Sequence, residues 1–366
     1  MSDNLLDRLN PGISQLNPYE PGRPIERVIE DYGITNAIKL ASNENPLGPS
    51  PKAKTVLGDL ANDLHLYPDG SGEELRNAIG KKEGVHENEI ILGNGSNDII
   101  DLCARAFLNY STSAVASKHA FIVYKIVTQA SGSRLIEVPT VNWSHDLEGF
   151  TKSIDSDTRV IFIANPNNPT GTYNSHREVK QLMKSISNDI LVVLDCAYFE
   201  YVTELDYVKP IELLKEFNNI MITKSFSKIQ GLASLRIGYG LSSPKTIEAL
   251  NRIRQPFNTN YVAQKLALAS LNDNDHIKRS LELNNYQKDK TFDNLINLGL
   301  EVIPSSGNFL SFTGNFNSIN IFERLMQRGI IIRPIDLYDM PNYLRVTIGT
   351  EEENTLFLNT LSTLLK

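Results

Sequence analysis

The stretch Met221-Ile-Thr-Lys-Ser-Phe-Ser-Lys228 organises our interpretation of the chain. The apolar run from Ile220 to Thr223 predicts a buried strand that ends in a cluster of serines and lysines. Lys228 then lies just past a strand end, which is where open α/β sheets bind their ligands. A lysine can form a Schiff base with a carbonyl compound. The alternative is a solvated surface lysine, so the other strand ends decide between the two.

Two further apolar runs end in polar groups. Residues 160–164 form a continuous apolar run, which is typical of a parallel strand buried on both faces, and the loop that follows contains Asn168. Residues 190–194 form a second such run, which ends at Asp195, with Tyr198 shortly after it. A carboxylate in apolar surroundings is costly unless a cation pairs with it. Asp195 therefore indicates a cationic partner, or else it caps the next turn.

A glycine-rich turn follows the expected strand at residues 90–92. The turn contains Gly95, Ser96 and Asn97, and an apolar-periodic helix comes directly after it. Strand, glycine turn and helix in this order point free backbone N–H groups at an anion. The motif is weak evidence alone, because it lacks the third glycine of a dinucleotide fingerprint and the lysine of a P-loop.

Two more side chains are candidates for the same site. Arg236 stands among glycines in the stretch 231–240, which suits a phosphate clamp, although a surface ion pair is the alternative. Phe121 follows the expected strand 113–117 at its junction with a helix, where an aromatic ring can cover a flat ligand. A core phenylalanine is the alternative for Phe121.

The last third of the chain predicts a small α/β domain, with two arginines on its strands. Arg333 and Arg345 are flanked by apolar residues, and half-buried arginines need an anion or an internal glutamate. The strands are expected at residues 300–303, 309–312, 330–333 and 344–348, and the helices at residues 319–328 and 351–365.

Composition excludes several classes of protein. The chain has 366 residues, a hydrophobic fraction of 41% and a net charge of −7 without a basic block, which argues against nucleic acid and anionic membranes as partners. No apolar run is long enough to span a membrane, and no signal sequence is visible. The six histidines lack metal-ligand spacing, so we expect no metal site. Cys103 and Cys196 form no disulfide framework, which fits a cytoplasmic protein.

The strand ends together predict a cofactor. Parallel strands bring their carboxyl ends to one crevice, so Lys228, Asp195 and the glycine turn around Ser96 are expected to meet there. An amine, an isolated carboxylate and a phosphate cradle are what pyridoxal 5′-phosphate requires. The carboxylate would keep the pyridine nitrogen protonated, because an adjacent negative charge favours the charged form.

At this point the chain resembles the fold-type-I pyridoxal-phosphate aminotransferases over essentially its whole length, and within them the histidinol-phosphate aminotransferases. The resemblance implies an α/β fold with an N-terminal arm (1–40), a large cofactor-binding domain with a mostly parallel central sheet flanked by helices (41–255), and a small α/β C-terminal domain that packs with the arm (256–366). The motifs that carry it are Ser42-Asn-Glu-Asn-Pro-Leu-Gly48, Tyr67-Pro68, Gly93-Asn-Gly-Ser96, Asn167-Asn-Pro-Thr-Gly171, Asp195-Cys-Ala-Tyr198, Ser225-Phe-Ser-Lys228, Leu235-Arg-Ile-Gly-Tyr239, Arg254-Gln-Pro-Phe-Asn258 and Leu344-Arg-Val-Thr-Ile-Gly-Thr350.

The resemblance also implies a role for each site residue. Lys228 would bind the cofactor and move a proton between Cα and C4′, and Asp195 would pair with the pyridine nitrogen. Phe121 would stack on the ring, and Tyr198 and Asn168 would bind the ring oxygen. The phosphate would be held by Gly95, Ser96, Asn97, Ser225, Ser227 and Arg236.

Other implied roles concern the substrates and a second subunit. Tyr67 would reach the cofactor phosphate of the neighbouring subunit, which implies a homodimer with shared active sites. Arg345 would bind the substrate carboxylate or phosphate, with Asn308 orienting it. Arg333 and Tyr19 would act at the distal end of the substrate.

Three positions depart from the family pattern. Cys196 stands where the family has glutamate, and Asn97 stands where it has an acid. The stretch before Phe121 reads Lys118-His-Ala120 in place of a proline–threonine pair.

The implied reaction is transamination by ping-pong kinetics, with histidinol phosphate as amino donor and 2-oxoglutarate as the 2-oxo acid. An aromatic amino-acid aminotransferase and a threonine-phosphate decarboxylase are alternatives within the fold. A non-catalytic ligand sensor and a dinucleotide-dependent oxidoreductase are alternatives from other classes. The intact lysine, aspartate and tyrosine set argues against the sensor, and the incomplete glycine motif argues against the oxidoreductase.

Overall fold

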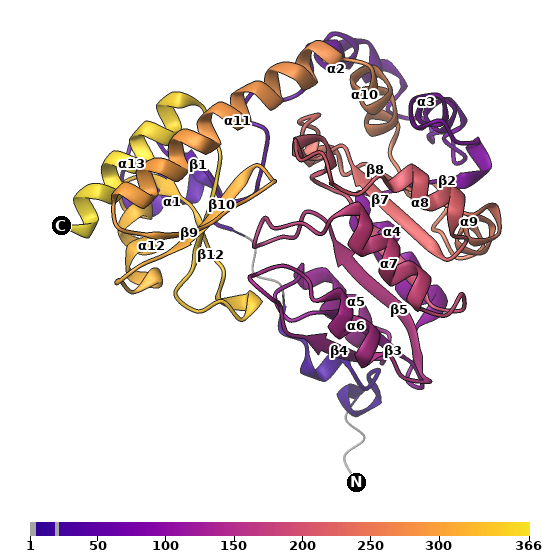
Figure 1. Cartoon of the computed structure of the whole chain (residues 1–366). Helices are drawn as coiled ribbons and strands as arrows, with labels where there is room; N and C mark the ends of the chain where they lie inside the picture. The colour runs from indigo at the N-terminus through magenta and orange to yellow at the C-terminus, as the bar shows by residue number, and fades with distance from the viewer. Residues whose placement is uncertain (1–4, 19–21) are drawn as a thin grey trace.

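The computed structural model describes residues 5–18 and 22–366. The chain forms two bodies, one around a seven-stranded sheet and one around a four-stranded sheet (Figure 1). We call these the large sheet and the C-terminal sheet. The large sheet has the order β2-β8-β7-β6-β5-β3-β4. Its strands are β2 (Ile90–Gly93), β3 (Ser113–Ser117), β4 (Arg134–Val138), β5 (Thr158–Ala164), β6 (Leu191–Asp195), β7 (Ile220–Ser225) and β8 (Gly238–Ser242).

The large sheet is mostly parallel, which confirms the predicted fold class. β4, β3, β5, β6 and β7 run parallel, and only β8 is antiparallel to its neighbours β7 and β2. Both faces are covered: Val160 and Phe162 of β5 pack into one core cluster, while Ile161 and Ile163 pack into the other. Burial on both faces explains why the sequence of β5 is apolar throughout.

Helices on both sides supply these two cores. Three helices cover one face, namely α4 (Ser96–Phe107), α5 (Ile122–Ala130) and α9 (Pro244–Asn251). The other face is covered by α2 (Pro51–Leu57), α3 (Glu73–Glu83), α6 (Leu147–Ser153), α7 (His176–Ser185), α8 (Pro210–Glu216) and α10 (Tyr261–Leu271).

Two strands of the large sheet were not expected from the sequence. β8 has glycine at two of its positions, and glycine is unfavourable in strands unless another group approaches closely. A Cβ atom at Gly238 would lie 2.7 Å from the backbone nitrogen of Ser96, and one at Gly240 would lie 2.8 Å from Met221 Sδ. The absence of side chains at Gly238 and Gly240 therefore allows α4 and β7 to pack closely against β8. The other unexpected strand, β4, is an edge strand whose residues are mostly partly exposed, so it lacks a continuous apolar run.

The C-terminal sheet has the antiparallel order β12-β13-β10-β9 and forms the small α/β body that was expected. The predicted strand at residues 330–333 is divided in the structure. Ile330 and Ile331 pair with a strand near the N-terminus, whereas Arg333 and Pro334 join the C-terminal sheet. The elements are β1 (Ile38–Lys39), β9 (Glu301–Ile303), β10 (Phe309–Thr313), β11 (Ile330–Ile331), β12 (Arg333–Pro334), β13 (Leu344–Thr347), α12 (Ser318–Met326) and α13 (Glu351–Leu365).

The helix α11 (Asn274–Asn297) joins the two bodies, whereas α1 (Ile25–Tyr32) packs on the C-terminal body. α11 begins beside α2 and α10 and runs to the C-terminal sheet, where it contacts β9, β10 and α13 (Figure 1). α1 packs through Val28 on Met326 and Ile331. α10 packs on α2 and α3. The division into residues 1–40, 41–255 and 256–366 stays a prediction.

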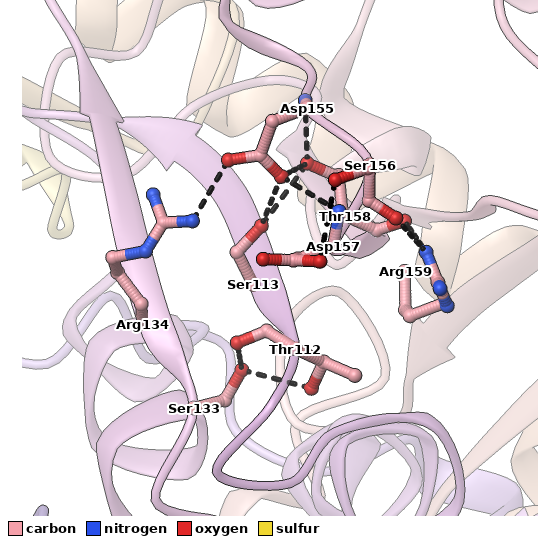
Figure 2. Close-up of polar contacts among 9 residues, drawn as sticks. All are labelled: Thr112, Ser113, Ser133, Arg134, Asp155, Ser156, Asp157, Thr158 and Arg159. Atoms are coloured by element: carbon pink, nitrogen blue, oxygen red, sulfur yellow. Dashed lines mark hydrogen bonds and ion pairs between the residues drawn. The ribbon is translucent and has the colours of Figure 1, made fainter.

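A polar cluster holds together the amino ends of β3, β4 and β5 (Figure 2). The carboxylate of Asp155 accepts hydrogen bonds from Ser113 Oγ at 3.1 Å, Thr158 Oγ1 at 3.0 Å and Arg134 Nη2 at 2.8 Å. These bonds lower the pKa of Asp155, with the Arg134 bond as the largest cause. The cluster lies at the edge of the sheet opposite to the carboxyl ends of these parallel strands.

Over the described residues, none of the helices is sufficiently long and apolar to cross a bilayer. Within the same ranges, His, Cys, Asp and Glu side chains form no group of three or more that could hold a metal ion.

Candidate active site

The site is built at the carboxyl edge of the large sheet. Ala164, Asp195 and Thr223 are register partners at the ends of β5, β6 and β7. β8 enters the sheet at this same edge, because Gly238 pairs with Ser225 of β7 on one side and with Gly93 of β2 on the other. The antiparallel strand thus brings the residues just before it, including Arg236, to the ends of the parallel strands.

A cavity of about 130 Å³ opens at this edge. Every residue predicted to bind the cofactor lines it, except Gly95 and Tyr67. The lining residues are Ser96, Asn97, Phe121, Ala164, Pro166, Asn168, Asp195, Ala197, Tyr198, Ser225, Ser227, Lys228 and Arg236. The structure thus brings the predicted residues together, while the role of each residue stays a prediction.

Lys228 is half-buried in the wall of the cavity. Its amine donates a hydrogen bond to the carbonyl oxygen of Ser42 at 3.1 Å and lies 5.4 Å from the centre of the Tyr198 ring. Burial lowers the pKa of Lys228 to about 7, and the nearby guanidinium groups of Arg345 and Arg236 lower it as well. A neutral, nucleophilic amine is therefore accessible near neutral pH.

Asp195 is buried opposite this amine. Its carboxylate accepts hydrogen bonds from Tyr124 and Thr223, each at 2.9 Å, and from the backbone N–H of Ala197 at 3.3 Å. Burial raises the pKa of Asp195, although the bonds from Thr223 and Tyr124 oppose that change. A buried carboxylate held in this way is suited to a cationic ligand in the cavity.

The phenol of Tyr198 is held by the segment before α2. Asn43 Nδ2 donates to Tyr198 Oη at 2.8 Å, and Asn43 has a φ of 56°, a left-handed conformation that asparagine tolerates better than most residues. Thr347 of β13 also contacts Asn43, accepting from its backbone N–H at 2.9 Å. The segment around Asn43 thus connects Tyr198 to the C-terminal sheet.

One end of the cavity is suited to an anion. α4 begins here after Gly95, and no side chain caps its first N–H groups. Arg236 donates from Nη1 to Ser227 Oγ at 3.2 Å, and a Cβ atom at Gly95 would lie 2.5 Å from Arg236 Nη2. Glycine is needed at position 95 for this approach. The helix start, the guanidinium and the serine hydroxyls form a phosphate-sized set of donors.

Arg345 lies at the other end of the site and is buried without an acidic partner among the described residues. Its Nη1 donates to Asn168 Oδ1, its Nη2 donates to the carbonyl oxygen of Ala41 at 2.9 Å, and its Nε has no partner. Asn308 donates to the carbonyl oxygen of Asn43 at 3.0 Å, and its Oδ1 is also buried without a partner. Arg345 Nε and Asn308 Oδ1 thus remain available to a polar ligand that reaches the neighbourhood of Asn168.

Arg345, Asn308, Arg333 and Tyr67 are not among the residues that line the cavity. Arg333 is the register partner of Arg345 across β12 and β13 and is half-buried. Tyr67 is 82% exposed and stacks on Phe257, with ring centroids 4.7 Å apart. Tyr19 lies outside the described residues. The roles predicted for Arg333, Tyr67 and Tyr19 stay predictions.

Sequence reasoning missed several residues that shape the site. Tyr124 and Thr223 hold Asp195, Asn43 holds Tyr198, and Ser42 accepts from Lys228. The stretch containing Ser42 and Asn43 is one of the motifs that carry the family resemblance, but no role at the site was predicted for either residue. The asparagine-rich composition of this stretch could have indicated such a role. Asparagine is favoured where the backbone is left-handed or where a side chain bonds to the backbone.

Two of the departures from the family pattern can also be located. Cys196 is fully buried in the core, and burial raises the pKa of its thiol to about 12, so it is an unreactive packing residue. Asn97 lines the cavity at the helix start. The arrangement as a whole offers an amine, a carboxylate beside it and anion-binding groups at both ends.

The chain matches a known protein family over most of its length. The family model described as aminotransferase class I and II matches residues 35–361. Histidinol-phosphate aminotransferase 2 of Pseudomonas fluorescens is 45% identical, with 100% of this chain and 99% of that protein covered. Histidinol-phosphate aminotransferase of Methylobacillus flagellatus is 44% identical, with 99% and 98% covered.

Solved structures agree with these relatives. The crystal structure of histidinol-phosphate aminotransferase from Sinorhizobium meliloti in complex with pyridoxal-5′-phosphate superposes with a TM-score of 0.89. It is 27% identical to this chain, and the superposition covers 98% of this chain and 97% of that one.

Proposed function

The chain belongs to the class I and II aminotransferases, and within them to the histidinol-phosphate aminotransferases, and from this we propose that it transfers the amino group of histidinol phosphate to 2-oxoglutarate. The products are imidazole-acetol phosphate and glutamate, in a step of histidine biosynthesis. The observation that carries the proposal is the meeting of Lys228, Asp195 and Arg236 in one cavity.

Pyridoxal phosphate fits the residues of this cavity. Its phosphate would be held at the uncapped start of α4 by the backbone and by side chains that surround Gly95. Phe121 would cover the ring, and Asp195 would accept from the protonated ring nitrogen. The residues for the phosphate are Ser96, Asn97, Ser225, Ser227 and Arg236, and those for the ring oxygen are Asn168 and Tyr198.

The chemistry of the bound group and that of the protein are complementary. Pyridoxal phosphate supplies an aldehyde that combines with amines and a cationic ring that withdraws electrons from the Cα of the amino donor. Lys228 takes the proton from Cα and returns it at C4′, which requires an amine that can be neutral near pH 7. Asp195 keeps the ring nitrogen protonated.

Arg345 is proposed to bind the anionic group of either substrate. Its buried Nε lacks a partner, and a guanidinium can bind a carboxylate or a phosphate by donating two parallel hydrogen bonds. Asn308 orients Arg345 or the substrate from the same side. Arg333 and Tyr19 are proposed to contact the distal end of histidinol phosphate.

Assembly and location are further parts of the proposal. Tyr67 is exposed and stands outside this cavity, which suits a residue that reaches the cofactor phosphate in a second subunit of a homodimer. Cys103 and Cys196 are free, buried thiols, which suits a reducing compartment, and we propose the cytoplasm.

A donor screen tests the function. The purified enzyme, loaded with pyridoxal phosphate, is mixed with histidinol phosphate, phenylalanine or threonine phosphate, and the cofactor absorbance and carbon dioxide release are recorded. We expect the largest absorbance change per unit time with histidinol phosphate. A faster change with phenylalanine would favour an aromatic aminotransferase, and carbon dioxide release would favour the decarboxylase.

The lysine is tested in the same assay. We expect Lys228→Ala to abolish turnover with every donor, because Lys228 supplies the only amine among the residues that line the cavity. Lys224→Ala is not a suitable control, since Lys224 forms a buried ion pair with Glu83. Lys245, which is exposed on α9, is suitable. Full turnover by Lys228→Ala would refute the assigned role.

A further inference from the structure

The only tryptophan of the chain sits between two aromatic side chains from different parts of the fold. Trp143 lies in the loop between β4 and α6, with its ring centroid 5.4 Å from that of His119 and 5.2 Å from that of Tyr343. Tyr343 belongs to the segment 335–343, which joins β12 to β13 in the C-terminal sheet and which we call the β12–β13 connection. The exposure of the Trp143 ring to solvent therefore depends on whether the β12–β13 connection lies against it.

His119 makes a polar contact with the same connection. Its Nδ1 lies 2.7 Å from the carbonyl oxygen of Tyr338. A carbonyl oxygen can only accept, so the proton of the His119 ring must be on Nδ1. This bond crosses from the large sheet to the C-terminal sheet.

The contact stands next to the cavity on one side and next to the arginines on the other. Asn167, which precedes Asn168, donates from Nδ2 to the carbonyl oxygen of His119 at 2.8 Å. On the other side, the β12–β13 connection begins after Arg333 and ends just before the strand of Arg345. The position of the β12–β13 connection against His119 therefore affects where Arg333 and Arg345 lie relative to the cavity.

We propose that His119 is a positioning residue for substrate binding: its bond to Tyr338 holds the β12–β13 connection against the large sheet and so keeps Arg333 and Arg345 in register with the cavity. The inference rests on the proposed function, because it assigns these arginines to the substrates. His119 belongs to the stretch Lys118-His-Ala120 just before Phe121.

The physical consequence is a change in affinity with little change in the chemical step. When the bond is lost, the connection spends less time docked. Only molecules with a docked connection bind substrate, so the apparent affinity is reduced in proportion to the docked fraction. Apolar packing of Ile335, Tyr338 and Met340 on Ile122 and Trp143 still favours docking. The loss is therefore that of one hydrogen bond, and bound substrate restores the docked state.

Two variants separate the hydrogen bond from the packing. His119→Phe keeps a ring against Trp143 but has no donor, whereas His119→Asn keeps a donor near the Nδ1 position. For His119→Phe we expect KM for histidinol phosphate and for 2-oxoglutarate to rise about fivefold with kcat nearly unchanged. For His119→Asn we expect both KM values to stay within about twofold of the wild type.

Acrylamide quenching of Trp143 fluorescence supplies a second readout that needs no substrate. Each variant is measured with its cofactor bound, and the quenching constant reports how far the ring is open to solvent. We expect it to rise in His119→Phe and to match the wild type in His119→Asn. Lys118→Ala is the matched control, since Lys118 is exposed in the same loop, and it should leave quenching and KM unchanged.

The outcomes distinguish this inference from the proposed function. If His119→Phe has the quenching constant and KM values of the wild type, or if His119→Asn is equally impaired, the positioning role is refuted. A fall in kcat at constant KM would indicate loss of folded enzyme and would also overturn it. If the wild type transaminates none of the donors, the proposed function fails, while the quenching comparison still tests the contact.

Discussion

The hydroxyl group of Tyr124 donates a hydrogen bond to Asp195 Oδ2 at 2.9 Å, although the two residues lie on different elements of the large-sheet body. Tyr124 is in the first turn of α5 and stacks on Phe162 of β5, with ring centroids 4.9 Å apart. This stacking fixes the phenol beneath the cavity. Asp195 is thereby supported as a carboxylate despite its burial.

Replacing Tyr124 by phenylalanine should weaken cofactor binding. Without the donor, the pKa of Asp195 should rise further, and a neutral carboxyl group cannot hold the ring nitrogen in its cationic form. We expect the Kd for pyridoxal phosphate to increase about fivefold, which corresponds to one hydrogen bond to a buried group. Titration of the apo-protein, followed by cofactor fluorescence, measures it.

Tyr173→Phe is a matched control, because Tyr173 also donates to an aspartate, Asp206 Oδ1, at 2.8 Å, but outside the cavity. An unchanged Kd in Tyr124→Phe, or an equal change in both variants, would contradict a specific link from Tyr124 to the cofactor.

The amine of Lys228 should titrate near neutrality in the apo-protein. Burial lowers its pKa to about 7, so the amine is cationic below that pH and neutral above it. Only the neutral amine can attack the aldehyde. The rate of pyridoxal phosphate uptake should therefore rise as the pH is raised through 7 and become constant above it. Stopped-flow absorbance from pH 5.5 to 9 measures this profile.

Arg345 provides the comparison, since its positive charge helps to lower the pKa of Lys228. Arg345→Gln should shift the midpoint of the uptake profile to higher pH. A wild-type uptake rate that still rises about tenfold per pH unit at pH 9, as for an amine with the ordinary lysine pKa of about 10.4, would show that Lys228 is not desolvated as the structure indicates.

Strands with a continuous apolar sequence could be predicted, because a strand buried on both faces is apolar throughout whichever elements cover it. β5, β6 and β7 were located in this way, and with them Asn168, Asp195 and Lys228 at their ends. β8 could not be predicted, because its sequence contains glycines in place of an apolar run. These glycines are required by the close approach of Met221 and Ser96, and only folding brings those two residues near β8.

The supporting residues of the site were harder to predict than the residues that line it. The contact of Asn43 with Tyr198 joins positions 155 residues apart, and no local pattern announces a contact of that span. Tyr124 looks like a core aromatic in a helix, and only its hydrogen bond to Asp195 distinguishes it.

Gly171 is held where no other residue fits. Its φ is 80°, and a Cβ atom would lie 2.2 Å from Ser305 Oγ in the segment before β10. Gly171 also accepts at its carbonyl oxygen from the backbone N–H of Ser306 at 2.8 Å. We expect Gly171→Ala to push residues 305–306 away from the loop of Asn168 and to reduce kcat/KM at least tenfold, which steady-state kinetics measures, because small displacements of positioning groups have large effects on rate.

Gly299→Ala separates steric from backbone effects. Gly299 has nearly the same φ, 79°, but has nothing within 4 Å of the added Cβ. We expect it to lose only about 1 kcal/mol of stability from the strained backbone, with kcat/KM unchanged. Equal effects of the two substitutions on kcat/KM would mean that the contact with Ser305 is unimportant.

Asp155 should stabilise the fold only while it is ionised. Its folded-state pKa is lowered below the ordinary value, first by the bond from Arg134 (Figure 2), so its contribution is present above an unfolded-state pKa of about 3.9 and is lost as the pH falls through the folded-state value. Because the pair is partly exposed and screened by solvent, we expect Asp155→Asn to lower Tm by only about 2 °C at pH 7. The difference from the wild type should be smaller at about pH 3, below the unfolded-state pKa, and in high salt. Asp157→Asn is the control, since Asp157 lies in the same turn but its carboxylate accepts only from Ser156 Oγ, at 3.3 Å. A loss of Tm that is equal at both pH values would show that Asp155 acts through shape and hydrogen bonding alone, without its charge.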